Sequence, residues 1–251
     1  MTFFLERDPW PLLPERPLVI IPVGSTEQHG PHLPFSTDTL VASAVATGVA
    51  ESLSVDGLPV VVAPAVAYGA SGEHQDFPGT SSIGSEALVV TLIELVRSLS
   101  NWAGRILFVN GHGGNVPALS VAVPRLIGEN HRVSWVPCAL PPGDSHAGDS
   151  HAGDSHAGRI ETSLMLHLAP ELVDLDRAAV GNREPLSALL PKLRSSGVRA
   201  VSSTGILGDP TGATPREGAR LLAEMIGSVR SRVDRGVVDD RGCLALPAGG
   251  S

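Results

Sequence analysis

Short apolar runs alternate with helical patterns along the first half of the chain, and this alternation constrains the fold more than any other feature. Such runs are expected of strands that are buried on both faces of a sheet. A strand–helix–strand order predicts parallel strands with helices on both sides. We therefore predict an α/β fold, a three-layer αβα arrangement with a mostly parallel central sheet. The expected strands cover residues 18–23, 60–63, 105–110 and 133–136, and the expected helices cover 39–54, 85–100 and 116–127.

The second half of the chain continues the helical patterns and has no linker between two cores. At 251 residues, the chain has the length of one sizeable α/β domain. We expect a single domain over residues 1–251, with an irregular arm at 1–16 and a flexible tail at 235–251. Further helices are expected from residue 158 to just before Pro170, over 186–195, and over 215–233 with Thr214 as its N-cap.

Charge and cysteine usage exclude several classes of protein. The formal net charge of -8 is scattered, with no basic stripe, which argues against nucleic acid or an anionic membrane as a partner. No apolar stretch approaches the roughly 18 residues of a membrane span, and residues 1–8 lack the order of a signal peptide. Cys138 and Cys243 are far apart in the sequence, so we expect two reduced thiols in a cytoplasmic protein.

Residues 24–38, G-S-T-E-Q-H-G-P-H-L-P-F-S-T-D, follow the first expected strand and are the main candidate for a functional site. Glu27 and His29 are two residues apart, so their side chains point to the same side of an extended segment. Asp38 stands where the next helical pattern begins, and it or Thr37 would cap that helix. Two carboxylates and an imidazole are ligand types that suit zinc, iron or manganese. The alternative is a polar turn with solvated side chains.

Two other loops that follow expected strands also carry metal-binding or acid–base side chains. Residues 65–80 form a loop of a length that is typical of functional loops, and it contains Tyr68, Glu73 and His74. The run N-G-H-G-G-N carries His112, and its glycines let the backbone pack closely around that side chain. The run has neither the Lys-Ser/Thr nor the G-x-G-x-x-G of nucleotide-binding loops.

The sequence Gly-Asp-Ser-His-Ala occurs three times in tandem over residues 143–157. We interpret the first two copies, 143–152, as a lengthened surface loop; the alternative is a His- and Asp-rich tract that binds metal loosely. The third copy adjoins a helical pattern, which puts His156 and Glu161 at a loop-to-helix junction. Because ligands of open parallel sheets gather beyond the carboxyl ends of the strands, we expect the four polar clusters to converge there.

In order and spacing, these segments resemble the creatininase family of metal-dependent amide hydrolases, over residues 18 to about 170. Within that family, the chain is most similar to the branch associated with mycofactocin, whose peptidase trims a modified precursor peptide. The segments that carry the resemblance are G-S-T-E-Q-H-G-P-H-L-P-F-S-T-D, Y-G-A-S-G-E-H-Q-D-F-P-G-T, N-G-H-G-G-N, H-A-G-R-I-E-T-S-L-M-L and, for the branch, L-G-D-P-T-G-A-T.

The resemblance implies a centre of two divalent metal ions, zinc or iron, with manganese as a further candidate. Asp38 would bridge the two ions. Glu27 and His112 would complete one site, and His29 and Glu161 the other.

This chain departs from creatininase itself at one position of the implied centre. In that enzyme a carboxylate stands two residues after the loop histidine, where this chain has Gly114. We therefore assign the second-site carboxylate to Glu161. The absence of a side chain at Gly114 also argues against creatinine as the substrate.

The activity implied by the resemblance is hydrolysis of a peptide bond near the C-terminus of a short modified peptide, releasing a Val-Tyr dipeptide. His156 is expected to protonate the leaving nitrogen, with Glu73 as a second catalytic group and with Tyr68 and His74 in contact with the substrate. An alternative substrate is a small cyclic amide or formamide resembling creatinine. The family also implies a homo-oligomer, a hexamer or an octamer.

Two other classes of protein remain compatible with the residues. A metal-dependent lyase or isomerase would need a base beside a carbon acid, and the sequence places no lysine near the site. A non-catalytic metal-binding protein is the other alternative.

Overall fold

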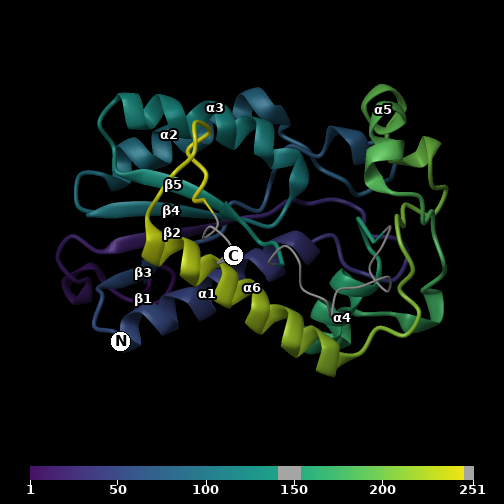
Figure 1. The fold of residues 1–251 in the computed structure, drawn as a ribbon, viewed down its shortest axis with the longest axis horizontal. Coiled ribbons are helices and arrows are strands. Elements are labelled where there is room, and N and C mark those ends of the chain that lie inside the picture. The colour runs from purple at the N-terminus through teal and green to yellow at the C-terminus, as the bar shows by residue number, and fades with distance from the viewer. Residues whose placement is uncertain (141–153, 246–251) are drawn as a thin grey trace, which may run out of the picture.

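The computed structural model describes residues 1–140 and 154–245, and its centre is a five-stranded parallel sheet. The strand order is β1-β3-β2-β4-β5 (Figure 1). This arrangement confirms the predicted α/β fold with a parallel central sheet. The strands are β1 (Thr2–Phe4), β2 (Leu18–Val23), β3 (Val60–Val62), β4 (Arg105–Asn110) and β5 (Val133–Pro137).

Helices cover both faces of the sheet because successive strand residues point to opposite sides. Val19 and Ile21 pack under α2 (Gly84–Leu99) and α3 (Val116–Gly128), whereas Ile20 packs against α1 (Thr37–Val55) and α6 (Pro215–Arg235). Figure 1 shows these two helical layers above and below the strands. The central strands are therefore buried on both faces, which explains their continuous apolar sequences.

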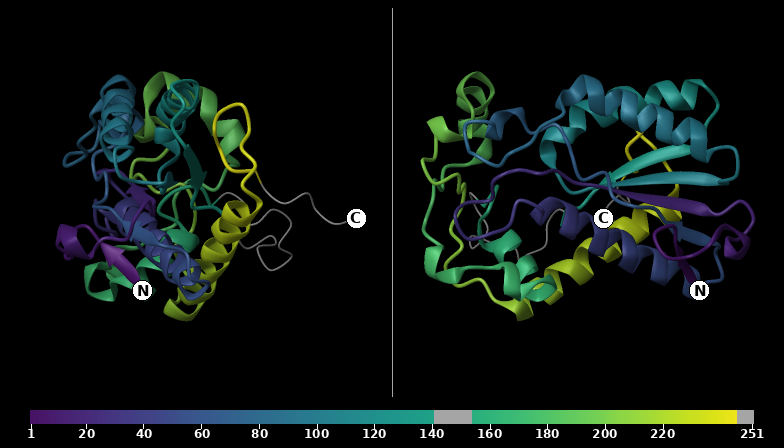
Figure 2. Two further views of the ribbon diagram at one scale, coloured as in Figure 1. Left: turned by 90° about the vertical axis from the view of Figure 1, so that its left-hand side faces the viewer. Right: turned by 180° about the vertical axis from the view of Figure 1, so that it is seen from behind.

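The last helices lie against the part of the molecule where the strands end. Both α4 (Arg159–Leu168) and α5 (Leu186–Ser196) lie at the end opposite the N-terminus in the two side-on views (Figures 1 and 2). The Arg159 Nε–H donates to Glu217 Oε2 at 2.8 Å, which ties α4 to α6. At the start of α6, the Thr214 side chain accepts a hydrogen bond from the Glu217 N–H, so the expected N-cap is confirmed.

Both chain ends are more regular than the sequence suggested. Thr2–Phe4, within the expected irregular arm, pairs with β3, and three residues among prolines are too short a signal for a strand. In the expected flexible tail, Cys243 and Leu244 are buried. The Leu244 N–H donates to the Trp135 carbonyl at 2.9 Å. Residues 246–251 lie outside the described residues, as do residues 143–152 of the repeat.

Helix α1 begins differently from the expectation. Its N-cap is Ser36, and neither Thr37 nor Asp38 caps it through a side chain. Asp38 instead lies in the first turn, where its carboxylate is free to face the ends of β2 and β4. Among the described helices, none is long and apolar enough to cross a membrane.

Candidate metal centre

Glu27 lies at the centre of the polar cluster, in the segment that leaves β2. It is fully buried, and neither of its carboxylate oxygens accepts a hydrogen bond from the described residues. His112 Nε2 lies 3.1 Å from Oε2, and His74 Nε2 lies 3.3 Å from Oε1. Burial is the main reason why the pKa of Glu27 is raised to about 7. A buried carboxylate without hydrogen-bond donors is energetically unfavourable. A cation bound between this carboxylate and the imidazoles would compensate its charge.

Asp38 connects two imidazoles. Its Oδ1 lies 3.2 Å from His29 Nε2, and its Oδ2 lies 3.2 Å from His112 Nδ1. The Ser25 hydroxyl donates to Oδ2 at 2.7 Å. Burial alone would raise the pKa of Asp38, but the charges and hydrogen bonds of the two histidines lower it well below its ordinary value. The carboxylate is therefore ionised and placed between the two halves of the cluster.

His29 and Glu161 complete the second half of the cluster. The His29 Nδ1–H donates to the Glu27 carbonyl at 3.1 Å, so Nε2 faces the carboxylates of Asp38 and, at 3.8 Å, Glu161. Glu161 lies in the first turn of α4, and the Ala157 N–H donates to its Oε2. A backbone carbonyl that accepts from the second nitrogen of an imidazole is a usual support for a metal-binding histidine.

Within residues 1–140 and 154–245, three groups of donor atoms lie close enough together to bind a metal ion. They combine neutral or cationic imidazoles with carboxylates, the mixed oxygen and nitrogen set that divalent zinc, iron and manganese accept. The residues present thus fit a divalent metal. The groups are Glu27, Asp38 and His112; His29, Asp38 and Glu161; and Glu27, His29 and His156.

His156 is buried beside this cluster. Its Nε2–H donates to the Gln28 carbonyl at 2.8 Å, and its Nδ1 lies 3.8 Å from Glu27 Oε1. Burial, followed by the charges of His29 and His74, lowers the pKa of His156 well below its ordinary value. The ring is therefore neutral, with an unprotonated nitrogen that faces the carboxylates.

The remaining expected site residues lie at different depths. Glu73 lies at the mouth, with Oε1 3.6 Å from His112 Nε2 and a partly exposed carboxylate. His74 is buried against Glu27. Tyr68 is 54% exposed and does not line either of the pockets described below. Its side chain thus lies apart from the cluster that the other residues form.

Gln28 and Ser25 are also buried in the cluster, although neither was expected at the site from the sequence. Gln28 contacts His74 and His156, and Ser25 contacts Asp38. Neither side chain can carry a charge at neutral pH, so neither resembles a ligand or an acid–base group. Their position between expected ligands on one segment was the signal that could have identified them.

A groove of about 960 Å³ opens onto the cluster. Glu73, His74 and His112 line it, and α5 supplies part of its wall, with Leu190 and Arg194 among the lining residues.

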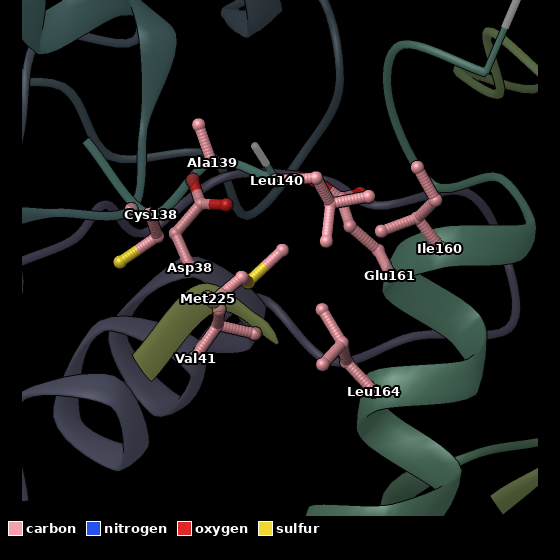
Figure 3. Close-up of a pocket in the computed structure, with 10 residues that line it drawn as sticks. Asp38, Val41, Cys138, Ala139, Leu140, Ile160, Glu161, Leu164 and Met225 are labelled. Carbon is pink, nitrogen blue, oxygen red and sulfur yellow. The ribbon is translucent and has the colours of Figure 1, made fainter. Parts of the chain in front are cut away.

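A second, smaller cavity of about 270 Å³ reaches the same carboxylates. Asp38 and Glu161 lie at its rim, and Val41, Leu164 and Met225 make its apolar floor (Figure 3).

The fold and the donor set define an α/β protein with a carboxylate–imidazole metal site at the carboxyl edge of a parallel sheet. A family model described as "Creatininase: Creatinine amidohydrolase" matches residues 10–233, so the chain belongs to the creatininase family. Together with the names of its relatives, this makes the protein a hydrolase that acts on carbon–nitrogen bonds.

Curated relatives fall into two groups by name. The chain is 52% identical to a mycofactocin precursor peptide peptidase of Mycolicibacterium smegmatis, over 91% of this chain and 89% of that protein. It is 32% identical to a creatinine amidohydrolase of Pseudomonas putida, over 64% of this chain and 67% of that protein.

Solved structures agree on the fold. A mutant creatininase of type II superposes with a TM-score of 0.76 at 26% identity, covering 94% of this chain and 98% of that one. A structure described as "Creatininase Mn" superposes with a TM-score of 0.72 at 23% identity, over 94% of this chain and 98% of that one, and supports the fold.

Proposed function

We propose that this protein is a metal-dependent peptidase that hydrolyses a peptide bond near the C-terminus of the modified mycofactocin precursor peptide and releases a Val-Tyr dipeptide. The name of the relative at 52% identity supports this substrate. The observation that carries the proposal is that the buried cluster opens onto a groove of about 960 Å³. A groove of that size accommodates several residues of a peptide, whereas creatinine would fill only a small part of it.

The proposed centre holds two divalent ions, zinc or iron, with manganese as a further candidate. Glu27 and His112 would hold one ion, His29 and Glu161 the other, and Asp38 both. When bound, the ions would lower the pKa of a shared water and polarise the carbonyl oxygen of the scissile bond. The buried oxygens of Glu27 and the position of Asp38 between two imidazoles support this assignment.

His156 is the proposed proton carrier. Its Nε2–H is held by the Gln28 carbonyl, so the unprotonated Nδ1 is available on the side of the cluster. This nitrogen can accept a proton from the attacking water and then give it to the leaving amine, which leaves the ring neutral again. Glu73, at the mouth of the groove, is the proposed second catalytic group and would orient the amine.

Three further expectations remain proposals. His74 and Tyr68 would bind substrate; the exposure of Tyr68 restricts any such role to a long peptide that extends beyond the groove. Two free thiols, Cys138 and Cys243, fit a cytoplasmic location. The family suggests a homo-oligomer, a hexamer or an octamer, assembled from a single catalytic domain.

The experiment compares three candidate substrates with the zinc- or iron-loaded protein. These are the modified precursor peptide, its unmodified form, and creatinine, with products followed by mass spectrometry. We expect release of a C-terminal dipeptide from the modified peptide. Ring opening of creatinine without any peptide cleavage would replace the proposal with the small cyclic amide alternative.

A further inference from the structure

Gln28 is buried between two histidines of the site, on the same segment as Glu27 and His29. We propose that Gln28 is a positioning residue that determines which ring nitrogen of His74 and of His156 carries the proton. The inference deepens the proposed function, because it rests on His156 as the proton carrier there. It follows from the hydrogen bonds of the Gln28 side chain and of the Gln28 backbone carbonyl.

The orientation of the Gln28 amide is determined by its own backbone. The Gly30 N–H donates to Gln28 Oε1 at 2.9 Å. The amide oxygen is therefore committed to that donor, and the NH2 group faces the imidazoles. The reversed amide would place two donors against each other at Gly30 and leave a buried N–H unpaired, which costs free energy.

The amide then assigns the proton of His74. Gln28 Nε2 lies 2.8 Å from His74 Nδ1, and it can only donate. His74 Nδ1 must accept, so it carries no proton, and the single proton of the ring lies on Nε2. That nitrogen lies on the side of Glu27, 3.3 Å from Oε1. Gln28 thus determines whether His74 turns an N–H or a lone pair to the side of Glu27.

The carbonyl of Gln28 assigns the proton of His156. Gln28 Nε2 also lies 3.1 Å from His156 Nε2, but the two amide hydrogens are used by His74 and by the Gly205 carbonyl. The Gln28 carbonyl, 2.8 Å from the same nitrogen, can only accept, so the Nε2 of His156 carries the proton. Its Nδ1 is left unprotonated on the side of Glu27. The second amide hydrogen of Gln28 is directed to the Gly205 carbonyl, at 3.2 Å. One residue therefore gives two neighbouring histidines the same tautomer, but His74 has its N–H on the side of Glu27, whereas His156 has a lone pair there.

Gly205 holds Gln28 in this arrangement. A Cβ at Gly205 would lie 1.9 Å from Gln28 Oε1, so any side chain there displaces the amide. Gly205 has a φ of +82°, and so does Gly57, which has open space around it. Alanine at the two positions meets the same backbone strain. The difference between the two variants therefore isolates the contact with Gln28.

The direct test is 15N NMR of the zinc-loaded protein labelled at histidine. The chemical shifts distinguish protonated from unprotonated ring nitrogens, and single His→Gln variants assign them. We expect protonated Nε2 and unprotonated Nδ1 on both His74 and His156. A proton on Nδ1 of either ring overturns the proposal. The NMR result does not depend on which substrate is cleaved. A failure of this proposal can therefore be distinguished from a failure of the proposed function.

Variants test the consequence for turnover. Gln28→Glu keeps the size of the side chain but removes its N–H, so His74 should move its proton to Nδ1 in the NMR spectrum. We expect the kcat for the modified peptide to fall about 10–100-fold, the range found when residues that surround and orient a metal site are changed, with KM changed little. Asn101→Asp makes the same chemical change at an exposed amide and should leave kcat unchanged.

Gly205→Ala is the second variant, in case Gln28→Glu does not fold. It should lower kcat and alter the His74 signal, whereas Gly57→Ala should do neither. Equal effects of the two glycine variants, or a wild-type tautomer and kcat in Gln28→Glu, would contradict the role of Gln28.

Discussion

Glu27 Oε2 lies 3.1 Å from His112 Nε2, although Glu27 follows β2 and His112 follows β4. Neighbouring parallel strands bring them together: Val23 at the end of β2 is in register with Asn110 at the end of β4. The segments that follow the two strands therefore start side by side at the carboxyl edge of the sheet. One half of the candidate metal centre is built by strand register, whereas the other half depends on the first turns of α1 and α4.

Asp38→Ala should abolish both metal binding and peptide cleavage while the fold is kept. The proposed bridge connects both halves of the centre, and its oxygens lie 3.2 Å from His29 and from His112. Metal content by elemental analysis and circular dichroism measure the two effects. Asp240→Ala, at an exposed position, is the control. A variant that retains two equivalents of metal would show that Asp38 is not a bridge.

His156→Ala should reduce kcat about 10²–10⁴-fold, the usual range for loss of a proton-transfer group. Metal content should stay close to that of the wild type, because the proposed ligand set does not include His156. His131→Ala is a matched control, since that ring lies outside the cluster, where it is hydrogen-bonded to Ser100 and lies 3.8 Å from Glu129. Loss of metal together with activity would make His156 a ligand rather than a proton carrier, as the donor group of Glu27, His29 and His156 allows.

The central strands could be predicted from the sequence because burial on both faces leaves an uninterrupted apolar run. Residues 18–23 and 105–110 were expected as strands, and the structure has β2 and β4 at those positions. β1 was missed because it is stabilised by pairing with β3, which local sequence does not encode. The same reason applies to Leu244, whose burial depends on a hydrogen bond to Trp135 across a long stretch of chain.

The candidate site was predictable to the extent that its residues are ionisable. Sequence spacing drew attention to Glu27, His29 and Asp38, and strand order indicated that His112 would join them. Gln28 could not be found in this way, because its role depends on His74 and His156, which contact its amide only in the folded protein. Tyr68 is the opposite case. Its loop follows a strand at the carboxyl edge of the sheet, but position in that loop does not determine the direction of the side chain.

Zinc affinity should rise with pH between 6 and 9. Burial alone would lower the pKa of His29 and His112, but Asp38 chiefly raises that of His29, and Glu27 that of His112, each to about 10. In the metal-free protein these rings hold protons that an ion must displace. The apparent affinity should increase about tenfold per pH unit for each proton released. Competition titrations with a chelator measure it, and a pH-independent affinity would contradict the protonated state.

His32 should make the metal-free protein less stable in mild acid. Burial, followed by the charge of His29, lowers its pKa from 6.5 to about 4. Between these values the unfolded chain takes up a proton that the folded protein does not, so stability falls as pH falls from about 6.5 to 4. The contribution is up to about 1.4 kcal/mol per pH unit. Urea unfolding of wild type and His32→Gln should show a shallower pH dependence for the variant; parallel curves would contradict the assignment.

The α5 wall of the groove should determine peptide affinity without affecting the metal centre. Leu190 lines the groove and is half-buried, so it offers apolar surface to a bound peptide. In Leu190→Asp, a carboxylate would have to be desolvated against the peptide. We expect KM for the modified peptide to rise about tenfold or more, with metal content and melting temperature unchanged. Leu172→Asp, an equally drastic change at a leucine that is 46% exposed and outside the groove, should leave KM as it is. If both variants bind the peptide like the wild type, the substrate does not contact α5.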